Sequence, residues 1–205
     1  MTDLFKEKAK DWDANERRKQ LSQGIGGAIL KNVALNDQMH VMDFGAGTGL
    51  ITAQVAPLVK KVTAVDVSQS MLDKLVSKVE LQGKVDILCQ DITAHPTGVE
   101  HDLIMSAMAM HHVEDTHNMV QKFAQHLKSG GQLALADLDA EDGGFHNPPS
   151  EGVFHKGFDR AAFGEILRLH GFKDIHFVTA YTAERENGNY PIFLAMATKH
   201  WGVAV

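Results

Sequence analysis

The residues Val41-Met42-Asp43-Phe44-Gly45-Ala46-Gly47-Thr48-Gly49-Leu50 predict three elements in succession. The first four, with Met39 before them, predict a short buried strand, and a helix begins at Leu50. The glycines between them allow a sharp turn and let a ligand lie directly against backbone N–H groups. A strand, a glycine-rich turn and a helix N-terminus together predict a nucleotide-type binding site.

The rest of the chain alternates between strand and helix patterns, which predicts βαβ units and a mostly parallel sheet with helices on both faces. We expect one α/β domain over residues 1–205, in which residues 1–35 form a helical cover. The short link at 182–189 favours an antiparallel final pair of strands. The expected strands are 41–44, 62–66, 85–89, 102–106, 132–138, 172–180 and 191–199, and the expected helices are 4–20, 21–33, 50–56, 69–82, 116–127 and 160–170.

Composition excludes several classes of protein. A formal net charge of −6 argues against a nucleic-acid-binding surface, because phosphate binding needs a basic stripe. Cys89 is the only cysteine, so neither an intramolecular disulfide nor a cysteine-based zinc site is expected. The first residues lack an apolar signal region, and no apolar run is long enough to span a membrane. We therefore expect a cytoplasmic protein, monomeric or homodimeric.

Three acids indicate which nucleotide the glycine turn would bind. Asp66 ends the second strand, where a carboxylate can accept two hydrogen bonds from a ribose diol. Asp91 follows the third strand, where it could accept a hydrogen bond from an adenine amine. Asp43 would repel a pyrophosphate but suits a cationic amino group. These acids favour S-adenosylmethionine over a nicotinamide dinucleotide, although an oxidoreductase stays open as an alternative.

At these residues the chain resembles the class I S-adenosylmethionine-dependent methyltransferases. The resemblance covers residues 41–49, 65–66, 90–92, 102–112 and 127–131. It implies a Rossmann-like, seven-stranded, mostly parallel sheet with an antiparallel last strand, and S-adenosylmethionine as cofactor. It also implies that Asp66 binds the ribose, that Asp91 and Ile92 frame the adenine, and that the turn flanks the methionine part. The predicted cofactor residues are Asp43, Gly45, Ala46, Gly47, Thr48, Gly49, Asp66, Val67, Met71, Gln90, Asp91, Ile92, Ala107, Met108, His111 and His112.

Residues 136–146, 154–159 and 12–15 look like a small bacterial branch of this family whose small-molecule substrate is unassigned. The acceptor is therefore expected to be a small molecule rather than a nucleic acid. A catalytically silent S-adenosylmethionine-binding module, or a partner subunit of another methyltransferase, is the alternative.

Histidines supply the candidate bases. Residues 141–158 form an irregular, glycine- and proline-rich segment that we expect on the substrate side. Within it, His155 is the first candidate base and His146 the second, with Asp139 or Glu141 as partner. His111 and His112 lack the spacing of a metal site, so no metal is expected; one ring should pack and the other face the cofactor. Phe5 and Trp12 are expected to anchor a covering helix in the core, although such helices often form lids.

Overall fold

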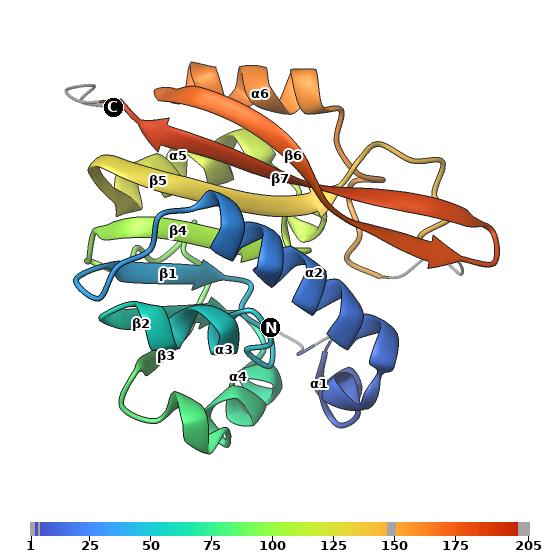
Figure 1. Cartoon of the computed structure of the whole chain (residues 1–205), viewed down its shortest axis with the longest axis horizontal. Coiled ribbons are helices and arrows are strands. Elements are labelled where there is room, and N and C mark those ends of the chain that lie inside the picture. Colours follow the sequence, from blue (N-terminus) through green and yellow to red (C-terminus); the bar gives the residue numbers. More distant parts are fainter. Residues whose placement is uncertain (1–2, 4, 147–150, 201–205) are drawn as a thin grey trace.

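The computed structural model describes residues 3, 5–146 and 151–200. Its centre is a seven-stranded sheet in the order β3-β2-β1-β4-β5-β7-β6 (Figure 1). All neighbouring pairs are parallel except those of β7, which runs antiparallel to both β5 and β6. The predicted fold class is therefore confirmed. The strands are β1 (His40–Phe44), β2 (Lys61–Asp66), β3 (Val85–Cys89), β4 (His101–Ala107), β5 (Leu127–Leu138), β6 (Phe172–Arg185) and β7 (Gly188–Lys199).

Helices cover both faces of the sheet, with α2 on one face and α5 and α6 on the other (Figure 1). Helices α5 and α6 lie in segments that cross between strands and must pass over a face of the sheet, whereas α2 precedes β1 and packs on the other face. The helices are α1 (Lys6–Ala9), α2 (Glu16–Asn32), α3 (Thr52–Val55), α4 (Gln69–Val76), α5 (Thr116–His126) and α6 (Arg160–Leu169). Short 3₁₀ helices are η1 (Trp12–Ala14), η2 (Ala56–Leu58), η3 (Val79–Leu81) and η4 (Met110–His112).

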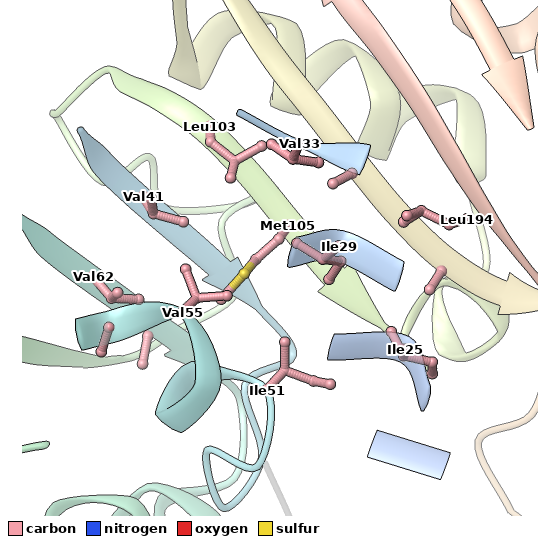
Figure 2. Packing of buried hydrophobic residues seen from close by; sticks show 14 of the residues in the cluster. Ile25, Ile29, Val33, Val41, Ile51, Val55, Val62, Leu103, Met105 and Leu194 are labelled. Carbon is pink, nitrogen blue, oxygen red and sulfur yellow. The ribbon is translucent and has the colours of Figure 1, made fainter. Parts of the chain in front are cut away.

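Side chains that alternate along the strands pack into two separate hydrophobic cores, one on each face of the sheet. On β1, Val41 packs toward the α2 face, whereas Met42 packs toward the α5 and α6 face. Figure 2 shows the first core, in which Ile25 and Ile29 from α2, with Val33 directly after the helix, lie against side chains from the sheet. This period of two is the one expected for strands buried on both sides.

The N-terminal helices differ from the prediction. The expected boundary between helices at residues 20 and 21 is wrong: α2 begins at Glu16, because Asn15 caps it by accepting a hydrogen bond from the Arg18 N–H at 3.2 Å. The glycines do not interrupt α2, and two of them, Gly24 and Gly26, let the helix pack closely against its neighbours. A Cβ on Gly24 would lie 2.5 Å from the Tyr181 ring, and one on Gly26 would lie 2.2 Å from the Gln54 side chain.

Other boundaries also differ from the prediction. Helix α4 ends at Val76 rather than at residue 82, and the chain continues into η3. Residues 129–131 belong to β5 rather than to a glycine stop after the helix. Strands β6 and β7 extend to Arg185 and from Gly188, so their connection is shorter than expected. Among the described residues, the helices include none long and apolar enough to cross a membrane.

Candidate functional site

The glycine turn joins β1 to α3 at the carboxyl edge of the parallel strands, where ligands bind in open α/β sheets. The N–H groups of Gly45 and Ala46 both donate to the Val65 carbonyl, at 2.8 and 3.0 Å. Gly45 has φ +69°, and a Cβ on it would lie 2.4 Å from the Cβ of Ala109. Gly47 has φ +55°, and a Cβ on it would meet nothing within 4 Å, so its backbone is open to a ligand. The turn, with the ends of β1 and β2, is called the floor below.

A cavity of about 480 Å³ lies above this floor. Most of the predicted cofactor residues line it, namely Asp43, Gly45, Ala46, Gly47, Thr48, Asp66, Val67, Met71, Gln90, Asp91, Ala107, Met108 and His112. Three predicted residues, Gly49, Ile92 and His111, are not among the lining residues. Ile92 is fully buried, and the Cα of Gly49 packs against Leu75, where a Cβ would come within 2.7 Å of the side chain.

Asp43 is buried at the base of the cavity, with 2% of its surface exposed. Its Oδ2 accepts a hydrogen bond from the Thr52 hydroxyl at 2.5 Å. Burial raises the pKa of Asp43 to about 7; the Thr52 bond opposes that rise and the nearby Asp66 charge adds to it. A cation placed beside Asp43 would stabilise the ionised form, so this carboxyl is suited to a positively charged ligand group.

Asp66 holds the floor together as well as facing the cavity. Its Oδ2 accepts from the Gly47 N–H and its Oδ1 from the Ser68 N–H, both at 2.8 Å. Burial raises its pKa, and these two backbone bonds partly offset the rise. Each carboxylate oxygen has a second lone pair, so the group can still accept hydrogen bonds from a ligand.

One carboxylate oxygen of Asp91 accepts hydrogen bonds within its own turn. Its Oδ1 accepts from the Thr93 N–H at 2.8 Å and from the Thr93 hydroxyl at 2.6 Å, the geometry of an Asx-turn. Its side chain also lines the cavity beside Gln90. The structural and the ligand-binding interpretations of Asp91 are therefore compatible.

The opposite side of the cavity is formed by residue 3 and residues 5–18, called the roof below. Asp3 accepts from the Ser68 hydroxyl at 2.8 Å, after β2, while the Phe5 ring lies 5.6 Å from that of His112, after β4. Since β1 lies between β2 and β4, the roof crosses above the glycine turn. Phe5, Trp12 and Arg18 all line the cavity. Phe5 and Trp12 are thus cavity residues, rather than only core anchors as expected.

Asp13 ties the roof to the floor. Its Oδ1 accepts a hydrogen bond from the Thr48 hydroxyl at 2.5 Å, and its Oδ2 pairs with the Lys78 ammonium at 2.8 Å. The first contact joins η1 to the glycine turn directly. Nothing in the sequence pattern pointed to this pair, because their positions are 35 residues apart.

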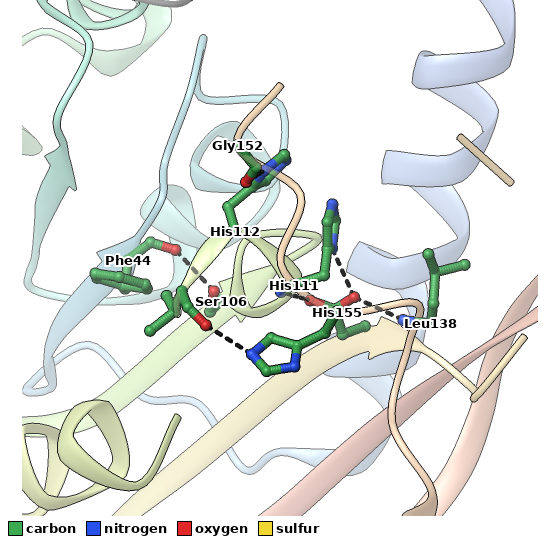
Figure 3. A network of polar contacts seen from close by, with 9 residues as sticks. Phe44, Ser106, His111, His112, Leu138, Gly152 and His155 are labelled. Carbon is green, nitrogen blue, oxygen red and sulfur yellow. Dashed lines mark hydrogen bonds and ion pairs between the residues drawn. The ribbon is translucent and has the colours of Figure 1, made fainter. Parts of the chain in front are cut away.

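Two adjacent histidines follow β4, and their side chains have different hydrogen-bond partners (Figure 3). His111 is 2% exposed, and its Nδ1 lies 2.8 Å from Asp137 Oδ1. His112 lines the cavity, and its Nδ1–H donates to the Gly152 carbonyl at 2.7 Å. Burial lowers the pKa of His112, so its Nε2 carries a free lone pair at neutral pH. One ring is packed and the other faces the cavity.

The two predicted bases do not line this cavity. His155 donates from Nε2 to the Val113 carbonyl at 2.9 Å, and its ring lies 5.1 Å from that of Phe158. His146 packs at 4.9 Å from the His111 ring, and burial with the neighbouring histidines lowers its pKa to about 4.

Their proposed partners also have other roles. Asp139 binds Arg160 through two contacts of 2.7 Å, and Glu141 accepts from the Gly143 N–H at 2.7 Å. Part of the predicted substrate-side segment, residues 147–150, lies outside the described residues.

Sequence reasoning missed Asp137 and Arg18, and it gave no sign of the backbone conformation of Met108. Asp137 is buried at the end of β5, where an acid in an apolar strand was the available signal. Met108 has φ +57° next to the cavity, an uncommon conformation that its side chain does not reveal. Across the described part of the chain, we find no group of three or more side chains arranged to hold a metal ion.

The comparisons with known proteins agree with this geometry. Residues 41–131 match a methyltransferase domain family. An uncharacterized methyltransferase of Geobacillus kaustophilus is 32% identical over 68% of this chain and 67% of its own length. Another from Schizosaccharomyces pombe is 32% identical over 58% of this chain, which spans only 48% of that relative.

Among solved structures, the N-methyltransferase NodS of Bradyrhizobium japonicum in complex with S-adenosylhomocysteine superposes with a TM-score of 0.71 at 17% identity. The match covers 96% of this chain and 99% of that one, and at this identity it shows a shared fold. The relatives and the matched domain, which contains the strand and glycine turn of the floor, together show that this chain belongs to the methyltransferase family.

Proposed function

We propose that the protein transfers a methyl group from S-adenosylmethionine to a small-molecule acceptor. The observation that carries this proposal is the cavity, in which the glycine turn of the floor is flanked by three carboxylates, Asp43, Asp66 and Asp91. A pyrophosphate would be repelled by this set, whereas a cationic adenosine compound would be attracted. The nicotinamide alternative is disfavoured for the same reason.

The residues present fit S-adenosylmethionine. Asp43 would face its ammonium group, Asp66 its ribose diol and Asp91 its adenine amine. The open backbone at Gly47 would allow close approach of the methionine part. When bound, S-adenosylmethionine supplies a methyl group activated by a sulfonium, which an acceptor lone pair can displace.

The chain contributes positioning and exclusion of water. The roof closes the cavity through Phe5 and Trp12, and Asp13 ties it to the floor. Where the acceptor must lose a proton, His112 is better placed than His155 or His146, because it lines the cavity and keeps Nε2 free. Asp137 and His111 lie directly behind it, with the two imidazole rings 4.2 Å apart.

A small acceptor is supported by the shape and charge of the molecule. The roof covers the floor, so a large polymer could not reach it without displacing residues 5–18. The net charge of −6 would also repel nucleic acids. A cavity covered by the roof, with the polar His112 ring inside it, supports an enzyme rather than a silent binding module.

Calorimetry with S-adenosylhomocysteine and NADH in parallel tests the cofactor. Saturable binding of the first alone is expected, and binding of NADH alone would overturn the proposal. Incubation of the protein with S-adenosylmethionine and a small-metabolite extract then tests transfer. Release of S-adenosylhomocysteine that depends on the extract supports the enzyme. Release only with macromolecular fractions would contradict the small acceptor.

A further inference from the structure

A second cavity of about 530 Å³ lies between the N-terminal half of α2 and the end of β6. Its walls include Arg17 and Arg18 from the helix and Tyr181 and Arg185 from the strand. These segments are far apart in sequence and meet only because α2 packs across the sheet (Figure 1).

The arginines of this cavity are not neutralised by the protein. Of the arginines in the chain, Arg160 pairs with Asp139 and Arg168 with Glu165. Within residues 3, 5–146 and 151–200, no carboxylate forms an ion pair with the other three, Arg17, Arg18 and Arg185. All three line the second cavity.

Arg185 is fixed in place without a hydrogen-bond partner for its Nε. The guanidinium lies 4.7 Å from the centre of the Phe145 ring, and Nε is buried and unpartnered in the described structure. An unpartnered buried donor is costly, because it has lost its water without gaining an acceptor. The positive charge of Arg185 is therefore left without compensation inside the described structure, and the residue lines the cavity.

Arg18 is close enough to Arg185 to feel its charge. Burial, followed by repulsion from Arg185, lowers the pKa of Arg18. The Arg18 guanidinium is stacked over the Trp12 ring at 3.9 Å, which holds its plane in one orientation. Two oriented guanidinium groups that repel one another are stabilised by an anion placed between them.

The acid that also lines this cavity does not replace such an anion. Glu184 precedes Arg185 on β6, so their side chains point to opposite faces of the strand. Arg185 lies on the face of Tyr181, whose ring packs against Gly24 of α2. Glu184 is exposed and Arg185 is partly buried, in agreement with this alternation.

The second cavity adjoins the cavity above the glycine turn. Arg18 and Leu21 line both of them. A ligand anchored on the arginines would therefore lie next to the proposed methyl-transfer site, on the side away from Asp66 and Asp91.

We infer that the second cavity binds a compact anionic group of the methyl acceptor, a carboxylate or a phosphate, through Arg18 and Arg185. The inference rests on the proposed function and adds the chemical class of the acceptor. The acidic floor selects the cationic methyl donor, and the arginine cavity selects an acceptor of opposite charge.

The test is NMR observation of the arginine Nε–H signals during separate titrations with inorganic phosphate and with acetate, in protein saturated with S-adenosylhomocysteine. Saturable shifts of the Arg18 and Arg185 signals are expected with at least one anion, and the anion that binds tells phosphate from carboxylate. Arg185→Gln should weaken that binding about tenfold or more, since a charge-assisted hydrogen bond is lost. Arg185→Lys should lie between Arg185→Gln and the wild type.

Arg168→Gln is the matched control, because Arg168 pairs with Glu165 on the exposed face of α6 and should leave anion binding unchanged. Equal affinity in Arg185→Gln and Arg168→Gln, or no saturable shift with either anion, overturns the inference. Calorimetric binding of S-adenosylhomocysteine in the same variants separates the two proposals. If the wild-type protein binds S-adenosylhomocysteine but neither anion, the arginine site alone is rejected. If the wild-type protein does not bind S-adenosylhomocysteine, both proposals are rejected.

Discussion

The floor and the roof of the cavity above the glycine turn face the same space but are held by different kinds of contact. The floor is fixed by backbone bonds, in which Gly45 and Ala46 donate to Val65 between adjacent parallel strands. The roof is attached mainly through side chains, with Asp3 and Asp13 as the acceptors. Backbone bonds depend on little besides the strand pattern, whereas each side-chain contact depends on one residue pair. Substitutions in the floor should nevertheless have larger effects than substitutions in the roof, because Asp43 and Asp66 of the floor also carry the proposed cofactor contacts and Gly45 has no room for a Cβ.

The largest effect is expected for Asp66→Ala. This change removes the acceptor of the Gly47 and Ser68 N–H groups as well as the proposed ribose contact. Loss of charge-assisted bonds should weaken S-adenosylhomocysteine binding about 100-fold. Isothermal calorimetry measures this affinity. Asp86→Ala on β3 is the control, since Asp86 forms an exposed pair with Lys61. Wild-type affinity in Asp66→Ala would remove the residue from the site.

The second-largest effect is expected for Gly45 of the floor, and Gly27 inside α2 provides the comparison. Gly45→Ala forces φ +69° on a residue with a Cβ and brings that Cβ to 2.4 Å from Ala109. We expect a loss of about 2 kcal/mol in the free energy of unfolding. A Cβ on Gly27, inside α2, meets nothing within 4 Å, so Gly27→Ala should instead add about 0.5–1 kcal/mol. Urea unfolding measures both, and equal effects of the two changes would contradict this contrast.

The third effect depends on pH. Burial raises the pKa of Asp43 to about 7 from 3.8, so below pH 7 the unliganded protein holds a proton that must leave when the ligand's ammonium group binds beside Asp43. Affinity for S-adenosylhomocysteine should therefore rise as the pH increases through about 6 to 7, by up to about tenfold per unit, and level off above. Calorimetry over this range measures the slope.

Asp43→Asn supplies the comparison, because it should bind weakly and without this slope. The same pKa has a consequence for the unliganded fold. The folded state holds more protons than the unfolded state between pH 3.8 and about 7, so the contribution of Asp43 to stability falls as the pH rises across that window. If the affinity for S-adenosylhomocysteine changed with pH equally in wild type and in Asp43→Asn, the assigned role of Asp43 would be contradicted.

The smallest effect is expected in the roof. Asp13→Ala removes the contacts to Thr48 and Lys78 but none of the predicted ligand contacts of the floor. Dissociation of S-adenosylhomocysteine should become a few-fold faster, since the roof closes less firmly. Stopped-flow dissociation measures the rate. Asp11→Ala, an exposed acid in the same segment, should leave it unchanged, and equal rates in the two variants would show that the Asp13 contacts do not hold the roof.

Sequence patterns predicted the floor better than the roof. The positions of Asp43, Asp66 and Asp91 follow from counting residues to the ends of strands, and parallel strands bring those ends to one edge. The roof depends on where α2 begins, which Asn15 determines by capping, and on the ring positions of Phe5 and Trp12. The histidines also show what the sequence left undetermined. His155 was the first candidate base because it lies in the irregular segment expected on the substrate side, but His112 is the histidine that lines the cavity.

By itself, the sequence determined the α/β class, the glycine turn and the acids beside it, because period-two strands, glycine conformations and strand ends are local properties. Tertiary structure alone decided that Asp13 would meet Thr48, that Asp137 would hold His111, and that Arg18 would lie near Arg185. Each of these contacts joins segments brought together by packing on the sheet, and no local pattern encodes the distance between two side chains that belong to different elements.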